Sequence, residues 1–229
     1  MGKLLLKNKE VAVPGEVIAE GMDYLPGFGT YREKEKIIAN RIGLLFVDGK
    51  VVKTIPLEGR YLPKVNDVII CRVFDVLMSG WRLDINSAYS AVLMLQEASF
   101  KYIQKGADLT KFFSLDEYVV AKIIRVSSQN LVDLTMKGPG LRKLDGGQII
   151  KVGTYKVPRI IGKKGSMISL IKDATGCRVI VGQNGYVWIQ GDPEKELLAI
   201  QTIKKIEEES HKSGLTDEIK KYLDKKVKK

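Results

Sequence analysis

Histidine and cysteine are scarce in this sequence of 229 residues: His211 is the single histidine, and Cys71 and Cys177 are the two cysteines. A structural zinc site takes four Cys or His ligands in most cases, so one copy of this chain cannot assemble a Cys/His zinc centre. The two cysteines are 106 positions apart, which excludes a CxxC redox motif and gives no sign of a disulfide framework. The sequence therefore predicts no metal site, and we expect no cofactor.

Long apolar runs are also absent. No stretch of about 18 apolar residues could cross a membrane, and the first ten residues, MGKLLLKNKE, lack the apolar core and cleavage site of a signal peptide. Hydrophobic residues still make up 45% of the chain and charged residues 28%, enough apolar material to build a core and exclude general disorder. We expect a soluble, cytoplasmic protein with no membrane partner.

Acidic residues are outnumbered, 27 against 38 Lys and Arg, which gives a net charge of +11 and a pI near 9.5. Such a balance favours a polyanionic partner. The excess is local, because residues 142–192 hold nine basic and three acidic residues, and residues 212–229 hold seven and three. The lysine-rich tail at 212–229 also fits a solvated helix end, so its role stays open.

Residues 1–60 read as short strands separated by turn chemistry. Turn residues stand at Pro14, Gly15, Gly27 and Gly29, and Asp48-Gly49 predicts a hairpin between residues 43–47 and 50–55. A module this small buries little apolar surface, so we expect it to pack against a neighbouring domain or another chain.

Residues 61–141 continue the β pattern. Five strands with one long link at 97–116 are typical of a small closed barrel of the oligonucleotide/oligosaccharide-binding kind. The predicted strands are 68–76, 81–85, 91–95, 118–126 and 131–136.

Alternation along the second of these strands puts Trp81 inside the barrel and Arg82 outside. Trp81 is thus expected in the core rather than as a stacking platform for bases. Arg82, Lys122 and Arg125 are the candidates for electrostatic contact with a nucleic acid, and the alternative for each is a solvated strand charge.

Residues 142–211 alternate strands and helices. They predict a strand over 148–155, a helix over 165–175 that Gly176 ends, a hairpin at Asn184-Gly185, and a helix that Asp192-Pro193 begins. The predicted hairpin strands are 178–181 and 186–190, and the last helix carries an apolar stripe of Leu197, Ile200, Ile203 and Ile206. A further helix from Thr216 within the 212–229 tail is marginal.

One loop has the residues of a phosphate-binding site. It is Gly162-Lys163-Lys164-Gly165, at the start of the helix over 165–175. Glycines let a partner approach the backbone, and the free N–H groups of a helix N-terminus favour a phosphate. Lys163, Lys164 and the preceding Arg159 add cations that position a nucleic acid without reading its bases. Apolar Ile161, Ile168 and the hairpin strand are expected to floor a groove that holds unstacked bases.

A GxxG motif alone is weak, and the P-loop alternative fails because Lys164 follows Gly162-Lys163 where that motif needs Ser or Thr. The run VPRIIGKKGSMISLIKDATGCRVIVGQNGYVWIQG, however, resembles the KH domain over about 35 residues in loop, helix and strand order. We therefore expect a multidomain chain, mainly β with an α+β C-terminal domain: a β module at 1–60, an S1-type barrel at 61–141, a KH domain at 142–211 and the tail.

The whole chain is similar to the archaeal S1/KH cap subunit of the RNA exosome, beginning with VAVPGEVIAEGMDYLPGFGTY. The resemblance implies a non-catalytic subunit whose first module docks on a hexameric ring of RNase PH-like subunits, with three caps around the pore. It also implies binding of single-stranded RNA, adenine-rich tails included, and guidance of 3′ ends to phosphorolytic sites. Pro14, Gly15, Gly27 and Gly29 would then present a ring interface.

Two other functions stay open at this point. A different S1/KH factor of translation or transcription would share everything except the first 60 residues. A stand-alone nuclease would need clustered carboxylates, whereas the acidic residues here are scattered along the chain or, at 207–209, lie on a solvated helix.

Overall fold

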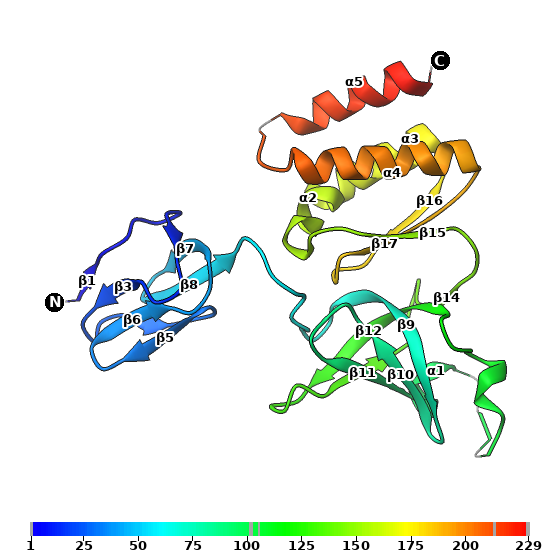
Figure 1. Cartoon of the computed structure of the whole chain (residues 1–229), viewed down its shortest axis with the longest axis horizontal. Coiled ribbons are helices and arrows are strands. Elements are labelled where there is room, and N and C mark those ends of the chain that lie inside the picture. Colours follow the sequence, from blue (N-terminus) through cyan, green and yellow to red (C-terminus); the bar gives the residue numbers. More distant parts are fainter. Residues whose placement is uncertain (1, 101–102, 105, 213, 228–229) are drawn as a thin grey trace. The chain divides into compact units, whose positions relative to one another are not determined.

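The computed structural model describes residues 2–100, 103, 104, 106–212 and 214–227. The chain divides into two compact units, Met1–Gly59 and Arg60–Lys229 (Figure 1), and each has its own hydrophobic core. None of the helices in these described ranges is long and apolar enough to span a membrane.

The first unit consists of two four-stranded sheets, ordered β1-β3-β6-β5 and β2-β7-β8-β4. The predicted hairpin at Asp48-Gly49 joins β7 and β8, with Gly49 at φ +60°. Ile18, Ile37 and Leu45 are fully buried between alanines and a valine. The strands are β1 Lys3–Leu4, β2 Val11–Ala12, β3 Val17–Glu20, β4 Leu25–Pro26, β5 Thr30–Glu33, β6 Lys36–Ala39, β7 Gly43–Asp48 and β8 Val51–Pro56.

The second unit begins with a closed barrel. Its strands pair in the order β13-β11-β10-β9-β12, and β13 also pairs with β12, which closes the sheet on itself and leaves no open edge among these five. The five strands match the predicted ones to within a residue or two. They are β9 Val68–Leu77, β10 Gly80–Asp84, β11 Ser90–Met94, β12 Tyr118–Val126 and β13 Val132–Thr135, and a sixth short strand, β14 Lys143–Leu144, pairs with β12.

Trp81 anchors the barrel core, as alternation predicts. Its side chain is fully buried, its Nε1 donates to the Phe113 carbonyl at 3.0 Å, and the two rings meet edge to face at 5.0 Å. Phe113 belongs to the long link, which forms helix α1 (Leu95–Ala98) and a 3-10 turn at Leu109–Lys111. The link therefore helps to fill the barrel.

An α+β domain follows, with a three-stranded sheet in the order β15-β17-β16. The strand expected over 148–155 is too long: β15 ends at Lys151, and a 3-10 turn and a short helix α2 (Val157–Ile161) follow. Pro158 lies in the first turn of α2, where the missing N–H of proline costs nothing. The remaining elements are β15 Gln148–Lys151, α3 Ser166–Thr175, β16 Arg178–Val181, β17 Tyr186–Gln190, α4 Pro193–Glu208 and α5 Leu215–Val227.

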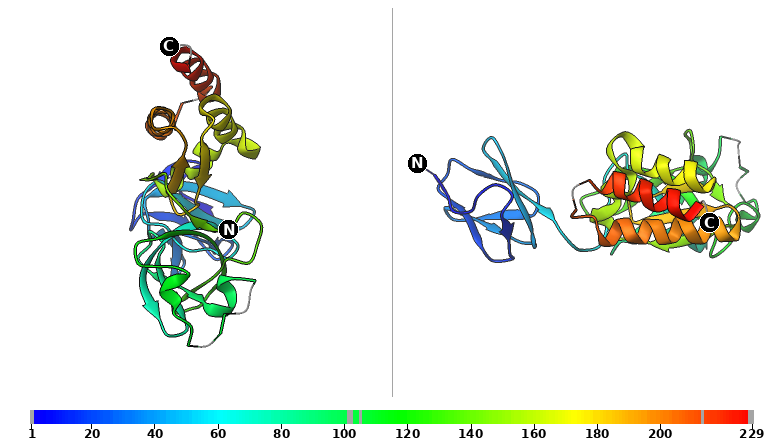
Figure 2. Two further views of the ribbon diagram at one scale, coloured as in Figure 1. Left: turned by 90° about the vertical axis from the view of Figure 1, so that its right-hand side faces the viewer. Right: turned by 90° about the horizontal axis from the view of Figure 1, so that it is seen from above.

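The last two helices correct one expectation and confirm another. Ile200, Ile203 and Ile206 are buried on α4 as predicted, but Leu197 is 56% exposed and lies outside the stripe. The further helix expected from Thr216 is α5, which packs alongside α3 and α4 (Figure 2). Leu215, Ile219 and Leu223, spaced four residues apart, are buried in the same core as α3 and α4. The tail is therefore integrated into the domain by an apolar stripe.

The barrel and the α+β domain are joined by a buried amide. The Asn184 side chain is fully buried, and its Nδ2 donates to the carbonyls of Ile70 at 2.7 Å and Ile85 at 2.9 Å. Its Oδ1 accepts from the Ile70 N–H at 3.3 Å. One hairpin side chain thus satisfies backbone groups of β9 and of the residue that follows β10.

We expect Asn184→Ala to lower the free energy of unfolding of this unit by about 2–4 kcal/mol, because three buried backbone groups lose their partner. Both tryptophans, Trp81 and Trp188, lie in this unit, so their fluorescence during urea unfolding reports on it alone. Gln183→Ala, at the exposed neighbouring position, is the control and should change stability by less than about 0.5 kcal/mol. Equal midpoints for the two variants would contradict this role of Asn184.

Candidate nucleic-acid interface

The loop between α2 and α3 has a backbone that only glycine adopts at its first position. Gly162 has φ +76° and ψ 172°, a combination essentially restricted to glycine. A Cβ there would also lie 2.7 Å from the N and Cβ atoms of Met167. Gly162 therefore allows α2 to end directly against the first turn of α3.

The next turn of the loop is left-handed. Lys164 (φ 54°, ψ 28°) and Gly165 (φ 81°, ψ 10°) both have positive φ, and the Gly165 N–H donates to the Gly162 carbonyl at 3.2 Å. For a lysine this conformation is uncommon. As a result the side chains of Lys163 and Lys164 are exposed at the loop tip.

Helix α3 begins immediately after this loop with an uncapped N-terminus. Among the residues that the structure describes, no side chain caps its first amides, and its first turn holds no acidic residue. The partial positive charge of a helix N-terminus is therefore not neutralised locally. Together with two exposed ammonium groups, these amides form a site suited to a phosphate oxygen.

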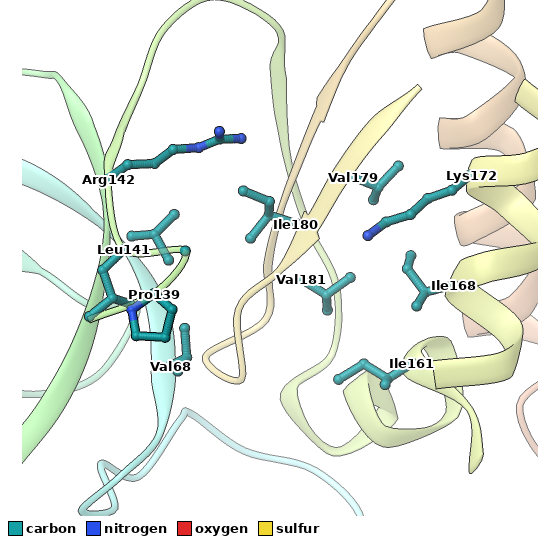
Figure 3. A pocket seen from close by; sticks show the side chains of 12 residues that line it. Val68, Pro139, Leu141, Arg142, Ile161, Ile168, Lys172, Val179, Ile180 and Val181 are labelled. Atoms are coloured by element: carbon teal, nitrogen blue, oxygen red, sulfur yellow. The ribbon is translucent and has the colours of Figure 1, made fainter. Parts of the chain in front are cut away.

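A groove of about 500 Å³ lies beside the loop (Figure 3). One wall comes from α2, α3 and β16, and its residues are Ile161, Ile168, Lys172, Val179, Ile180 and Val181. The prediction that Ile161, Ile168 and the hairpin strand floor a groove is thus confirmed. The other wall comes from the barrel and the linker behind it.

Arg159 is placed apart from the loop tip. Its side chain is half-buried, and its Nη2 donates to the Lys212 carbonyl at 2.5 Å, in the connection between α4 and α5. The structure therefore brings together Gly162, Lys163, Lys164 and Gly165, and gives the Arg159 guanidinium an intramolecular partner. This bond uses one N–H of the guanidinium, and an RNA contact by Arg159 stays a prediction.

The three basic residues predicted on the barrel do not gather in one patch. Arg82 is exposed and pairs across the sheet with Asp75, whereas half-buried Lys122 pairs with Val68 at the other end of β9. Seven residues of strand separate the two positions, about 23 Å. Arg125 is exposed opposite Asp133. Lys122 is the one of the three that lies next to a groove-lining residue.

Of the four predicted interface residues of the first unit, Gly15 and Gly29 lie near the end of β6, whereas the Gly27 N–H donates to the Val52 carbonyl of β8 at 2.8 Å. The Gly15 N–H donates to the Ala39 carbonyl at 2.8 Å, and the Asn40 N–H donates to the Gly29 carbonyl at 3.0 Å. Pro14 and Gly15 are exposed and Gly27 is half-buried. Gly29 is buried against Thr54, where a Cβ would lie 2.0 Å from Oγ1, so it offers no surface to a partner.

An apolar surface on the first unit was missed at the sequence level. Val11, Leu44 and Ile55 form one cross-strand row on β2, β7 and β8. Val11 and Ile55 are each 48% exposed and Leu44 is half-buried. The flanking Val13, Ile42 and Leu57 are also exposed. We call these six residues the apolar row. Alternation did not reveal it, because the opposite face of the same strands is apolar too.

Three family models match successive parts of the chain. Residues 9–58 match the N-terminal domain of the exosome RNA-binding protein RRP4, residues 60–123 match the RRP4 S1 domain, and residues 147–205 match the KH domain.

Full-length relatives agree with these matches. Exosome complex component Rrp4 of Pyrococcus furiosus is 45% identical over 227 residues, covering 97% of this chain and 86% of that protein. The Rrp4 of Methanothermus fervidus is 40% identical over 221 residues, covering 96% and 97%. A crystal structure assigned as an exosome complex RNA-binding protein is similar with a TM-score of 0.66 and 32% identity, over 73% of this chain and 97% of that one. The chain, with its N-terminal β module, S1-type barrel and KH domain, belongs to the Rrp4 family.

Proposed function

We propose that this chain is a non-catalytic, RNA-binding cap subunit of a cytoplasmic exosome. The observation that carries the proposal is the loop at 162–165, which exposes two lysines and an uncapped helix N-terminus beside an open apolar groove. Phosphates of a single strand would be held at the loop, and its unstacked bases would enter the groove.

The role in assembly rests on the first unit. The relatives are named as components of an exosome complex, and the N-terminal family model covers residues 9–58. This match favours an exosome subunit over another S1/KH factor of translation or transcription. None of the three matching models describes a catalytic domain, so the chemistry would belong to other subunits.

We further propose how the subunit is placed. Residues 1–60 would dock on a hexameric ring of RNase PH-like subunits, with three caps per ring, while the barrel at 61–141 and the KH domain at 142–211 bind RNA. The strand would then be guided, 3′ end first, toward phosphorolytic sites in the ring, and adenine-rich tails would be among its substrates.

The apolar row supports docking of the first unit. An exposed sheet face with several aliphatic side chains is typical of a surface that a partner covers. The row lies on strands β2, β7 and β8, whereas the predicted contacts at Pro14 and Gly15 lie in the turn that follows β2. A docking surface made of both would combine aliphatic burial with backbone contacts at the turn.

The loop predicts a charge-dependent affinity. We expect Lys163→Asp/Lys164→Asp to weaken binding of short single-stranded RNA at least tenfold, about 1.4 kcal/mol. The slope of log K against log salt should fall by about 1.4, since each lost phosphate contact removes about 0.7 for a single strand. Fluorescence anisotropy at several salt concentrations measures both quantities. Lys220→Asp/Lys221→Asp, an exposed lysine pair on α5, makes the same change in net charge. If the loop variant behaves like this control, the loop has no part in binding.

The apolar row predicts a separable defect in assembly. We expect Ile55→Asp to abolish co-purification of the full chain with an archaeal RNase PH-like ring while leaving its RNA affinity unchanged, because a buried aspartate would face apolar partners. Deletion of residues 1–60 should have the same effect on assembly. Leu197→Asp places the same charge on an exposed leucine of α4 and should still co-purify. Recovery of the ring by the Ile55→Asp chain would refute docking through this face.

A further inference from the structure

The groove beside the loop has a second wall that comes from outside α2, α3 and β16. Val68 and Val120 of the barrel and residues 139–142 of the linker face α3 and β16 across it (Figure 3). The volume of about 500 Å³ lies within the roughly 300–1,000 Å³ of pockets that enclose small ligands. A strand that leaves the loop therefore runs between two walls.

The linker wall is fixed to both domains. The Arg142 carbonyl accepts from the Val120 N–H at 2.8 Å, and the next two residues form β14, which pairs with β12. Lys143 adds an ion pair with Glu117 at 2.7 Å. On the other side, the Arg142 guanidinium lies 5.7 Å from the centroid of the Trp188 ring. The wall is held in place before any ligand arrives.

Two cations point into the groove from opposite walls. Figure 3 shows Arg142 reaching from the linker and Lys172 reaching from α3. Lys172 lies one helical turn beyond Ile168, and both cations are exposed. Within the described part of the chain, neither forms an ion pair with a carboxylate. Positive charge is thus available in the groove at a place separate from Lys163 and Lys164.

We propose that the barrel and linker complete the groove into a slot for one strand of RNA, held at both ends. Loop 162–165 would grip the backbone at one end, Arg142 and Lys172 would bind a phosphate at the other, and about four nucleotides would span the two. Unpaired bases occupy the apolar space between Leu141 and Ile168. A complementary strand would have to occupy the same space between the two walls, so we expect the slot to select single strands over duplexes. This inference rests on the proposed RNA-binding function of the loop.

The test compares three variants of the full chain in binding a short single-stranded RNA. Arg142→Met/Lys172→Met removes both slot cations and keeps an apolar side chain over Trp188. Lys204→Met/Lys220→Met, at exposed positions on α4 and α5, is the matched control for net charge. The loop variant Lys163→Asp/Lys164→Asp reports on the proposed function itself.

We expect the slot variant to bind about tenfold more weakly than the control, with a salt slope lower by up to about 1.4. Addition of the complementary RNA strand should release the RNA from the wild-type chain. If the loop variant binds weakly but the slot variant binds like the control, the second wall has no part in RNA binding, and the proposed function of the loop still holds. Normal binding by the loop variant would overturn both.

Stability is monitored by tryptophan fluorescence, because Arg142 covers Trp188. If the double variant is destabilised, Lys172→Met alone decides the case, since it leaves the Arg142 contact intact. It should weaken binding with roughly half the change in salt slope, about 0.7. An affinity and slope equal to those of Lys204→Met would overturn the proposal.

Discussion

The spacing between the barrel and the KH domain depends on one buried amide. The Asn184 side chain hydrogen-bonds three backbone groups of the barrel segment 70–85. In addition, the Asn86 Nδ2 donates to the Asn184 backbone carbonyl at 2.8 Å. An apolar seam that includes Ile70, Val120 and Trp188 surrounds this contact. Because an unpaired buried amide is costly, these contacts hold the barrel against the KH domain, and the groove is lined by residues of both.

Most of the fold was predictable where the turn residues and the pattern of buried side chains indicate the same element. The barrel strands alternate around a closed core, and Asn184-Gly185 is a strong hairpin signal, so these elements were found almost to the residue. Helix α2 was missed because the strand was expected to continue to residue 155, although Pro158 suits the first turn of a helix. The turn between β5 and β6 was missed because it holds Lys34 at φ 55°, where a glycine would have marked it.

The candidate site was predictable only as far as it is local. Gly162, Lys163, Lys164 and Gly165 are consecutive, so their motif was visible in the sequence. The second wall of the groove brings β9 and the linker next to α3. No periodic pattern in the sequence predicts that these distant segments lie close together. The hydrogen bond from the Arg159 guanidinium to the connection after α4 was not foreseen, and an RNA contact by Arg159 stays a prediction. Contacts of Arg82, Lys122 and Arg125 with RNA stay predictions.

We propose that the amides and lysines at 162–165 hold an RNA strand in the groove. Amide chemical-shift mapping of the isotope-labelled full chain can test this residue by residue as single-stranded RNA is added. We expect the largest changes at 162–166, with further changes across the groove at Leu141 and Arg142. Changes centred on α4 and α5, with the loop amides unmoved at saturation, would contradict it.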